Sequence, residues 1–219
     1  MVGRVPDSSR LTRVQQQERT HERLLASGRS VFLRRGFLAT TVEEIAATAG
    51  YTRGAVYKHF GGKEGLWQAI IEARADLLLA GLRDALAQVT TRADLLATLD
   101  PSRAVSTDDA PRWTVVSAEY LAAISEHPAH AAALTALQRR LDQAVVDLLT
   151  RHCQRLHLRP AMPLPHLVVA WSALGGGLAL LAAVDPTTEV SAITAGVLAA
   201  LLPPADHPDR PTPEARTSD

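Results

Sequence analysis

Residues 41–63 combine cations, hydroxyl groups and small residues in a pattern that suits contact with a nucleic acid. The candidates for such contact are Thr41, Thr52, Arg53, Gly54, Tyr57, Lys58, His59 and Lys63. An arginine can pair with guanine through two hydrogen bonds, worth about 1–3 kcal/mol of discrimination, so Arg53 is the candidate for reading sequence. Gly54 lets the backbone come close to DNA. Phosphate contacts set register but carry no sequence information, and the side chains that suit them are Thr41, Tyr57, Lys58 and Lys63.

Two short helices are expected to position these side chains. Thr41 and Glu44 have the spacing of a capping box, in which the threonine accepts from an early backbone N–H and the glutamate reaches back to the cap. Apolar residues then recur at helical spacing up to Ala49, and Gly50 stands where a helix commonly ends in a left-handed residue. Thr52 is a second candidate N-cap, for a helix that ends near residue 59. The pattern predicts a helix-turn-helix, whose second helix enters the major groove.

The segment from Arg19 to about Gln68 resembles the DNA-binding domain of the tetracycline-repressor (TetR) family of bacterial transcription regulators. The residues that carry the resemblance are Gly36-Phe37, Thr41-Val42-Glu43-Glu44-Ile45-Ala46, Ala49-Gly50-Tyr51-Thr52-Arg53-Gly54-Ala55-Val56-Tyr57, His59-Phe60 and Lys63-Glu64-Gly65-Leu66. The match covers about a quarter of the 219 residues. Gly62 departs from the family pattern, which often has Ser, Asp or Asn there, but glycine is also an acceptable N-cap.

The whole chain is expected to be all-α, with an N-terminal three-helix helix-turn-helix domain followed by a helical-bundle ligand-binding and dimerisation domain. Besides the two short helices, the expected helices cover residues 16–35, 63–88, 91–99, 112–125, 129–157, 167–184 and 189–202, with a loop at 101–111. The expected divisions are a flexible basic arm at 1–15, the helix-turn-helix domain at 16–62, the helical domain at 63–202 and a disordered proline-rich tail at 203–219. Arg10 and Arg13 of the arm either reach a minor groove or make no defined contact.

Charge is distributed unevenly along a chain whose net charge is zero. Residues 1–65 hold 11 Lys and Arg against 6 Asp and Glu, whereas the remainder holds 12 against 17. A basic N-terminal third gives a local electrostatic footprint for DNA, although chance asymmetry is an alternative. The single cysteine, Cys153, excludes an intramolecular disulfide and is compatible with a reducing cytoplasm. The N-terminal residues lack the apolar segment of a signal peptide.

Residues 167–184 form an uncharged run of 18 residues, the minimum length of a membrane helix. Three consecutive glycines at 175–177 and a serine argue against that interpretation. An all-round apolar helix is instead expected where one face meets the core and the other meets a partner. The family resemblance implies that the last two helices of two subunits form a four-helix bundle. The expected partner is therefore a second copy of the chain, bound through residues 165–202, and no membrane.

The C-terminal half offers weaker candidates for binding a small molecule. Trp113, Tyr120 and Trp171 could line a cavity, with Glu119 and His166 as polar anchors, although core aromatics are the commoner case. Cys153 and His157 lie one helical turn apart beside His152, but a full set of metal ligands is not visible, and a buried cysteine beside a solvated histidine is the alternative. No cofactor, metal ligand or catalytic residue is predicted.

Three classes of function follow. The resemblance implies a DNA-binding regulator, by default a repressor, whose small-molecule effector changes the spacing of two recognition helices on a palindromic operator. A ligand-independent or architectural DNA-binding protein is the alternative on the same scaffold. An enzyme is disfavoured because the sequence shows no nucleophile elbow, phosphate loop, zinc signature or paired-carboxylate motif.

Overall fold

Three helices form the N-terminal part of the computed structural model, which describes residues 12–100 and 109–204. They are α1 (Arg13–Arg35), α2 (Val42–Ala49) and α3 (Arg53–Phe60). Helix α1 begins three residues before its expected start because Thr12 and Gln15 form a capping box. Arg13, expected in the arm, is therefore the first residue of a helix, whereas Arg10 lies outside the described residues.

The rest of the described chain continues in helices, as expected. They are α4 (Lys63–Ala87), α5 (Arg92–Thr98), α7 (Ala110–Ile124), α8 (Pro128–Arg155), α9 (Leu164–Val184) and α10 (Val190–Leu201). The predicted all-α class is confirmed, and the bounds differ from expectation by a few residues. The arm up to residue 11, residues 101–108 of the expected loop and the tail from residue 205 lie outside the described residues.

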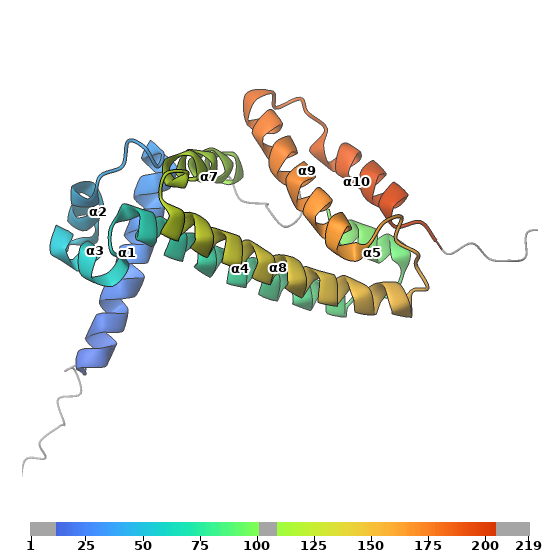
Figure 1. Ribbon diagram of the computed structural model, residues 1–219, viewed down its shortest axis with the longest axis horizontal. Helices are drawn as coiled ribbons and strands as arrows, with labels where there is room; N and C mark the ends of the chain where they lie inside the picture. The colour runs from blue at the N-terminus through green and yellow to red at the C-terminus, as the bar shows by residue number, and fades with distance from the viewer. Residues whose placement is uncertain (1–11, 101–108, 205–219) are drawn as a thin grey trace, which may run out of the picture.

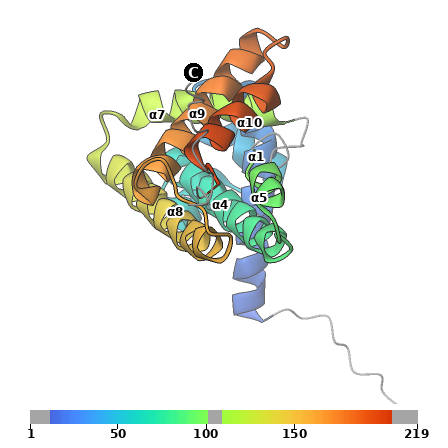
Figure 2. The same ribbon diagram turned by 90° about the vertical axis from the view of Figure 1, so that its right-hand side faces the viewer.

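The helices are arranged along one long direction, with α1–α3 at one end (Figure 1). Helices α4 and α8 pack side by side and lead away from that end. Helix α9 packs on α7 and α8, and α10 packs on α9 and α5. Helix α7 crosses the direction of α4 and α8 (Figure 2) and also contacts α1. It therefore joins the N-terminal helices to the C-terminal ones.

Two clusters of buried apolar side chains hold this arrangement together. The first lies among α1–α4 and includes Phe32, Ile45 and Trp67, together with Val116 and Tyr120 of α7. The second joins the end of α4 and α5 to α8, α9 and α10. Because α7 contributes to the first cluster, the helix-turn-helix domain shares its core with a helix expected to belong to the C-terminal domain.

Two glycines allow the sharp passage from α3 into α4. Gly62 has φ 144°, a backbone conformation that residues with a Cβ rarely adopt, so a serine, aspartate or asparagine there would be strained. A Cβ on Gly65 would lie 1.9 Å from the carbonyl oxygen of Phe60, which excludes any side chain at that position. The departure from the family pattern at position 62 therefore follows from the local backbone.

Tyr120 is fully buried in the first cluster, edge-on to Phe37 with ring centroids 5.2 Å apart. Within the described residues its hydroxyl makes no hydrogen bond, and burial, followed by the charges of Glu64 and Glu72, raises its pKa to about 12. A buried hydroxyl without a partner is costly. We therefore expect Tyr120→Phe to raise the free energy of unfolding by about 1 kcal/mol.

Urea unfolding measures this change, with Tyr51→Phe as the control because Tyr51 is only partly buried. A decrease in stability specific to Tyr120→Phe would show instead that the hydroxyl is bonded in the folded protein.

Candidate DNA-binding surface

The turn between α2 and α3 is built by local backbone bonds. The hydroxyl of Thr41 accepts from the N–H of Glu44 at 3.2 Å and so caps α2. Gly50 ends α2 in the left-handed region at φ 75°, where its N–H meets the carbonyls of Ala46 and Ala47. The expected helix-turn-helix is therefore present, and it fixes the direction in which α3 leaves the domain.

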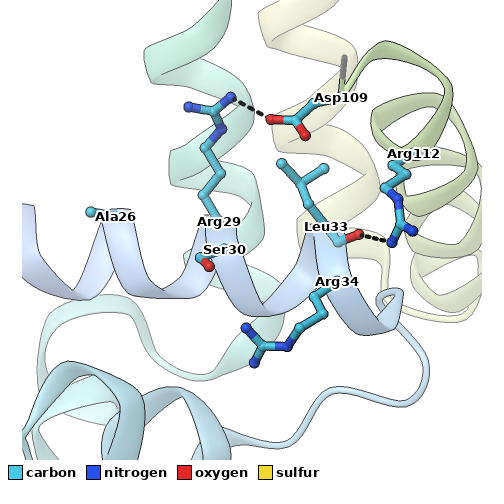
Figure 3. Close-up of a pocket in the computed structure, with 7 residues that line it drawn as sticks. All are labelled: Ala26, Arg29, Ser30, Leu33, Arg34, Asp109 and Arg112. Carbon is cyan, nitrogen blue, oxygen red and sulfur yellow. Dashed lines mark hydrogen bonds and ion pairs between the residues drawn. The ribbon is translucent and has the colours of Figure 1, made fainter. Parts of the chain in front are cut away.

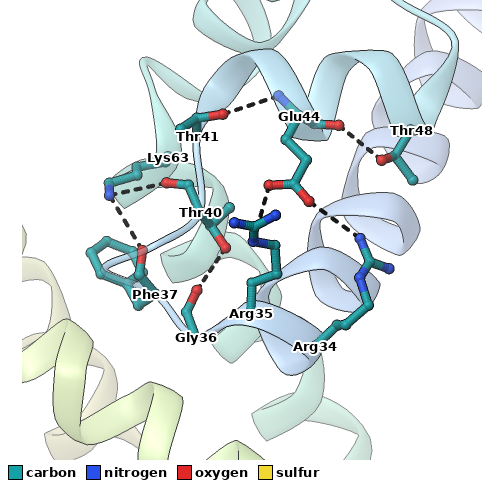
Figure 4. A network of polar contacts seen from close by, with 9 residues as sticks. All are labelled: Arg34, Arg35, Gly36, Phe37, Thr40, Thr41, Glu44, Thr48 and Lys63. Atoms are coloured by element: carbon teal, nitrogen blue, oxygen red, sulfur yellow. Dashed lines mark hydrogen bonds and ion pairs between the residues drawn. The ribbon is translucent and has the colours of Figure 1, made fainter.

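One detail of the expected cap is wrong. The Glu44 side chain does not reach back to the cap but lies 3.4 Å from Arg34 and 3.5 Å from Arg35 at the end of α1 (Figure 4). Two cations compete for this carboxylate, and a charge-assisted pair is stronger than a bond to a neutral N–H. Glu44 thus ties α2 to α1, while Thr41 alone caps the helix.

Helix α3 buries Val56 and exposes most of its other side chains. The exposed residues include five of the predicted contacts: Thr52, Arg53, Gly54, Tyr57 and Lys58. Thr52 precedes the helix in an extended conformation and is exposed, and its side chain makes no capping bond. A Cβ on Gly54 would meet only the Thr52 hydroxyl at 3.6 Å, so the backbone there is open to a close partner.

Arg53 is 71% exposed and lies 3.4 Å from Glu43, which is itself 63% exposed. An ion pair between two solvated side chains contributes little, typically below about 1 kcal/mol. This weak pair orients the guanidinium at the N-terminal end of α3, and the guanidinium can leave it at little cost in free energy. A base edge that offers two acceptors would replace this carboxylate at small cost.

His59 faces α1 rather than the open side of α3. Its ring lies 5.9 Å from the ring of His21, which in turn lies 4.6 Å from the ring of Phe60. Burial, then the charges of His21 and Lys58, lower the pKa of His59 below its usual value of 6.5. At neutral pH His59 is therefore mostly uncharged, so it would contact phosphate as a neutral donor.

Lys63 is the predicted phosphate contact that the structure uses internally. Its ammonium donates to the carbonyls of Phe37 at 3.3 Å and Thr40 at 3.2 Å, and it lies 4.8 Å from the centre of the Phe37 ring (Figure 4). These bonds hold the start of α4 against the loop between α1 and α2. One of the three ammonium donors remains for a phosphate.

Comparison with known proteins agrees with this geometry. The family described as "Bacterial regulatory proteins, tetR family" matches residues 24–70. Over 52 residues the chain is 48% identical to the HTH-type transcriptional repressor BepR of Brucella suis, covering 24% of this chain and 25% of BepR. Over 78 residues it is 36% identical to the HTH-type transcriptional activator FasR of Mycolicibacterium smegmatis, covering 36% of this chain and 35% of FasR. The matches thus span about a quarter to a third of these relatives.

Residues 24–70 thus match the DNA-binding domain of the TetR family. The fold shared with solved TetR-family structures extends beyond the matched segment. Salmonella enterica GusR superposes with a TM-score of 0.68 over 88% of this chain and 98% of its own, at 21% sequence identity. At that level of identity the likeness establishes the fold of the C-terminal helices, which the TetR-family match does not reach.

A carboxylate on α7 binds the backbone next to the helix-turn-helix. Glu119 accepts from the backbone N–H groups of Phe37 at 2.6 Å and Leu38 at 3.0 Å. Nearby, Arg112 donates to the carbonyl of Leu33 at 3.1 Å. The sequence indicates Glu119 only as a possible ligand anchor, because no local pattern reveals a bond between residues 82 positions apart. These contacts link the end of α1 to the helix that packs on α9.

We expect Glu119→Gln to lower the free energy of unfolding by about 1–2 kcal/mol. The amide oxygen can still accept both bonds, but hydrogen bonds to a charged acceptor are worth more than bonds to a neutral one. Urea unfolding measures the change, with the exposed Glu126→Gln of the same region as the matched control. Equal stability of the two variants would contradict a bonding role for the Glu119 carboxylate.

The three aromatic candidates for a ligand pocket lie in different places. Trp113 lines a groove between α1, α4 and α7 and lies 4.8 Å from the ring of Trp67. Tyr120 is buried in the first core cluster. Trp171 packs, partly buried, against the second cluster. His166, the other proposed anchor, is exposed near the start of α9. The structure therefore does not bring these residues together around one cavity.

The candidate metal ligands on α8 also diverge. The ring nitrogens of His152 meet the carbonyls of Leu148 at 2.8 Å and Leu86 at 2.9 Å, which joins α8 to α4. Cys153 is buried, and burial raises the pKa of its thiol. His157 lies beyond the end of α8 with φ 50° and is exposed. Among the described residues, no group of three or more His, Cys, Asp and Glu is placed to hold a metal ion.

Proposed function

We propose that the protein is a transcription regulator that binds a palindromic DNA operator as a homodimer. The observation that carries this proposal is the open face at the N-terminal end of α3, where Thr52, Arg53 and Gly54 are exposed. In helix-turn-helix proteins this end of the second helix contacts base edges. Tyr57 and Lys58 lie further along α3, and Thr41 at the start of α2, as the proposed phosphate contacts.

The proposed dimer forms through residues 165–202. Helix α9 is long and apolar enough to cross a membrane by length and composition alone. Only 17% of its most apolar stretch is buried within one chain, so most of that stretch is free to contact a partner. Val169, Leu180 and Val184 lie on one stripe of α9 and are 55%, 42% and 87% exposed. Ideal Cβ atoms on the glycines at 175–177 would meet nothing within 4 Å. An exposed apolar stripe with room for close approach suits a second copy of the helix.

A small-molecule effector is the second part of the proposal. Helices α4 and α7 both contact α1, so a ligand that prefers one arrangement of the C-terminal helices would also move the DNA-binding domain. It would release the operator by favouring a spacing of the two α3 helices other than the roughly 34–36 Å that adjacent half-sites need. Repression, with release by the ligand, is the proposed direction, and the cytoplasm is the proposed location.

Ligand-independent DNA binding is the second candidate, because Trp113, Tyr120 and Trp171 lie at three separate places among the described residues. The two candidates differ in one observable, which is whether any small molecule changes the affinity for the operator.

A reporter assay tests the regulatory direction. A bacterial promoter carries the inverted repeat that the protein selects, and the chain is co-expressed with it. Repression predicts that the intact chain lowers the reporter signal relative to cells without the protein. Arg53→Ala should leave the signal near the level of those cells. A higher signal with the intact chain would make the protein an activator, and an equal signal for both would contradict regulation through α3.

A further inference from the structure

A groove of about 480 Å³ runs between α1, α4 and α7, at the junction of the DNA-binding domain and the C-terminal helices. Its walls are mostly apolar and include Leu25 of α1, Leu77 and Leu78 of α4, and Trp113 of α7. Leu77 is 75% exposed and Leu78 is 41% exposed, so the groove offers apolar surface to solvent. Its size is that of a small-molecule site.

Cations lie at the α7 end of this groove. The Arg74 guanidinium lies 4.3 Å from the centre of the Trp113 ring, and burial, followed by the charge of Arg29, lowers its pKa. Among the described residues no carboxylate forms an ion pair with Arg74: Asp109, whose charge partly opposes the lowering of the Arg74 pKa, pairs with Arg29 at 3.3 Å. A partly buried guanidinium that is stacked but not paired has donors free for an anion.

The cationic end continues into a second cavity of about 510 Å³ that shares Ala26 and Arg29 with the groove. Arg112 lines this cavity and donates through one nitrogen to the carbonyl of Leu33 (Figure 3); among the described residues, no ion pair occupies its other donors. Arg34 also lines it but is paired with Glu44. Across the two cavities the arginines, which are Arg29, Arg34, Arg74 and Arg112, outnumber the two lining carboxylates, Glu22 and Asp109.

We propose that this groove binds a small amphipathic anion, with an alkyl or aryl body against Trp113, Leu77 and Leu78 and a carboxylate at Arg74. The occupant's charge matches the cationic end, and its apolar body covers side chains that are otherwise solvated. Glu22 lies in the groove as well and disfavours a second anionic group. Because α1 forms one wall, the site is separate from the interior of the C-terminal bundle.

Calorimetric titration of the intact protein with octanoate tests the proposal without DNA, so it stands apart from the proposed regulatory function. We expect saturable binding that is at least about tenfold weaker in Arg74→Gln and in Leu77→Glu, since loss of one charge-assisted contact costs on the order of 1.4 kcal/mol. The matched controls on α4 are Arg83→Gln and Ala85→Glu, which change exposed residues outside the groove. Octanol, which lacks the charge, should bind at least about tenfold more weakly than octanoate.

Circular dichroism and thermal unfolding establish that each variant is folded before titration. Affinity retained by both controls and lost by Arg74→Gln and Leu77→Glu supports the proposed site. Absence of saturable octanoate binding would overturn it. Equal affinity of either groove variant and its control would also overturn it, because binding would then occur elsewhere on the protein.

Discussion

The double variant Val169→Arg with Leu180→Arg is expected to be a monomer at micromolar concentration and to lose about 10²- to 10⁴-fold in operator affinity. Both positions lie on the exposed stripe of α9, so the dimer would bury four new arginines in the proposed interface. Buried like charges oppose association. A monomer engages one half-site at a time and so forfeits the gain from simultaneous binding.

Light scattering measures the oligomeric state, and fluorescence anisotropy with a labelled operator duplex measures affinity. The matched control is Val115→Arg with Leu121→Arg, which places the same charges on exposed apolar positions of α7. The control should remain a dimer with unchanged affinity. A dimeric Val169→Arg, Leu180→Arg variant would place the interface elsewhere, and a monomeric intact protein would refute the proposed homodimer.

Arg53→Ala is expected to relax preference at one base pair of each half-site, by about 1–3 kcal/mol between the best and the other bases. The guanidinium is 71% exposed at the N-terminal end of α3 and is held only by a solvated pair with Glu43. Its loss would remove the proposed base contact without disturbing the buried face of α3. Competition binding with a set of single-position operator variants measures the preference.

Lys58→Ala provides the contrast. Lys58 is exposed on α3, and loss of a phosphate contact should weaken all operator variants alike and reduce the salt dependence of binding by about one ion. An even loss of affinity across operator variants in Arg53→Ala would show that Arg53 contacts phosphate rather than a base. Lys63 is less suitable for this contrast, because its ammonium also holds two backbone carbonyls.

Local sequence signals were sufficient for the helix-turn-helix. Thr41 caps α2 and Gly50 ends it, and both functions depend on backbone groups within a few residues. The start of α1 was missed by three residues, because the capping box of Thr12 and Gln15 lies among polar residues that have no apolar periodicity.

Contacts between distant residues could not be predicted from local patterns. Glu44 has the spacing of a capping box, yet it pairs with two arginines whose positions depend on how α1 packs on α2. Lys63 and Glu119 each bind backbone groups of the loop between α1 and α2, from 23 to 82 residues away. Those backbone groups come within reach only when the three-dimensional fold has formed.

The aromatic candidates illustrate the same limit. Residue type marks Trp113, Tyr120 and Trp171 as large and apolar, but it does not separate a wall of a cavity from a core position. Tyr120 is fully buried because α7 packs against the DNA-binding domain, which the division of the chain at residue 63 did not anticipate.

Selection of bound sequences from a random DNA library tests the central proposal most directly. The purified intact protein is used at a fixed salt concentration near the physiological value, because affinity for DNA depends steeply on salt. The proposed homodimer with two α3 helices predicts enrichment of an inverted repeat whose half-sites are spaced by about one DNA turn. The absence of any enriched sequence, with only weak, salt-sensitive binding, would contradict specific recognition by α3.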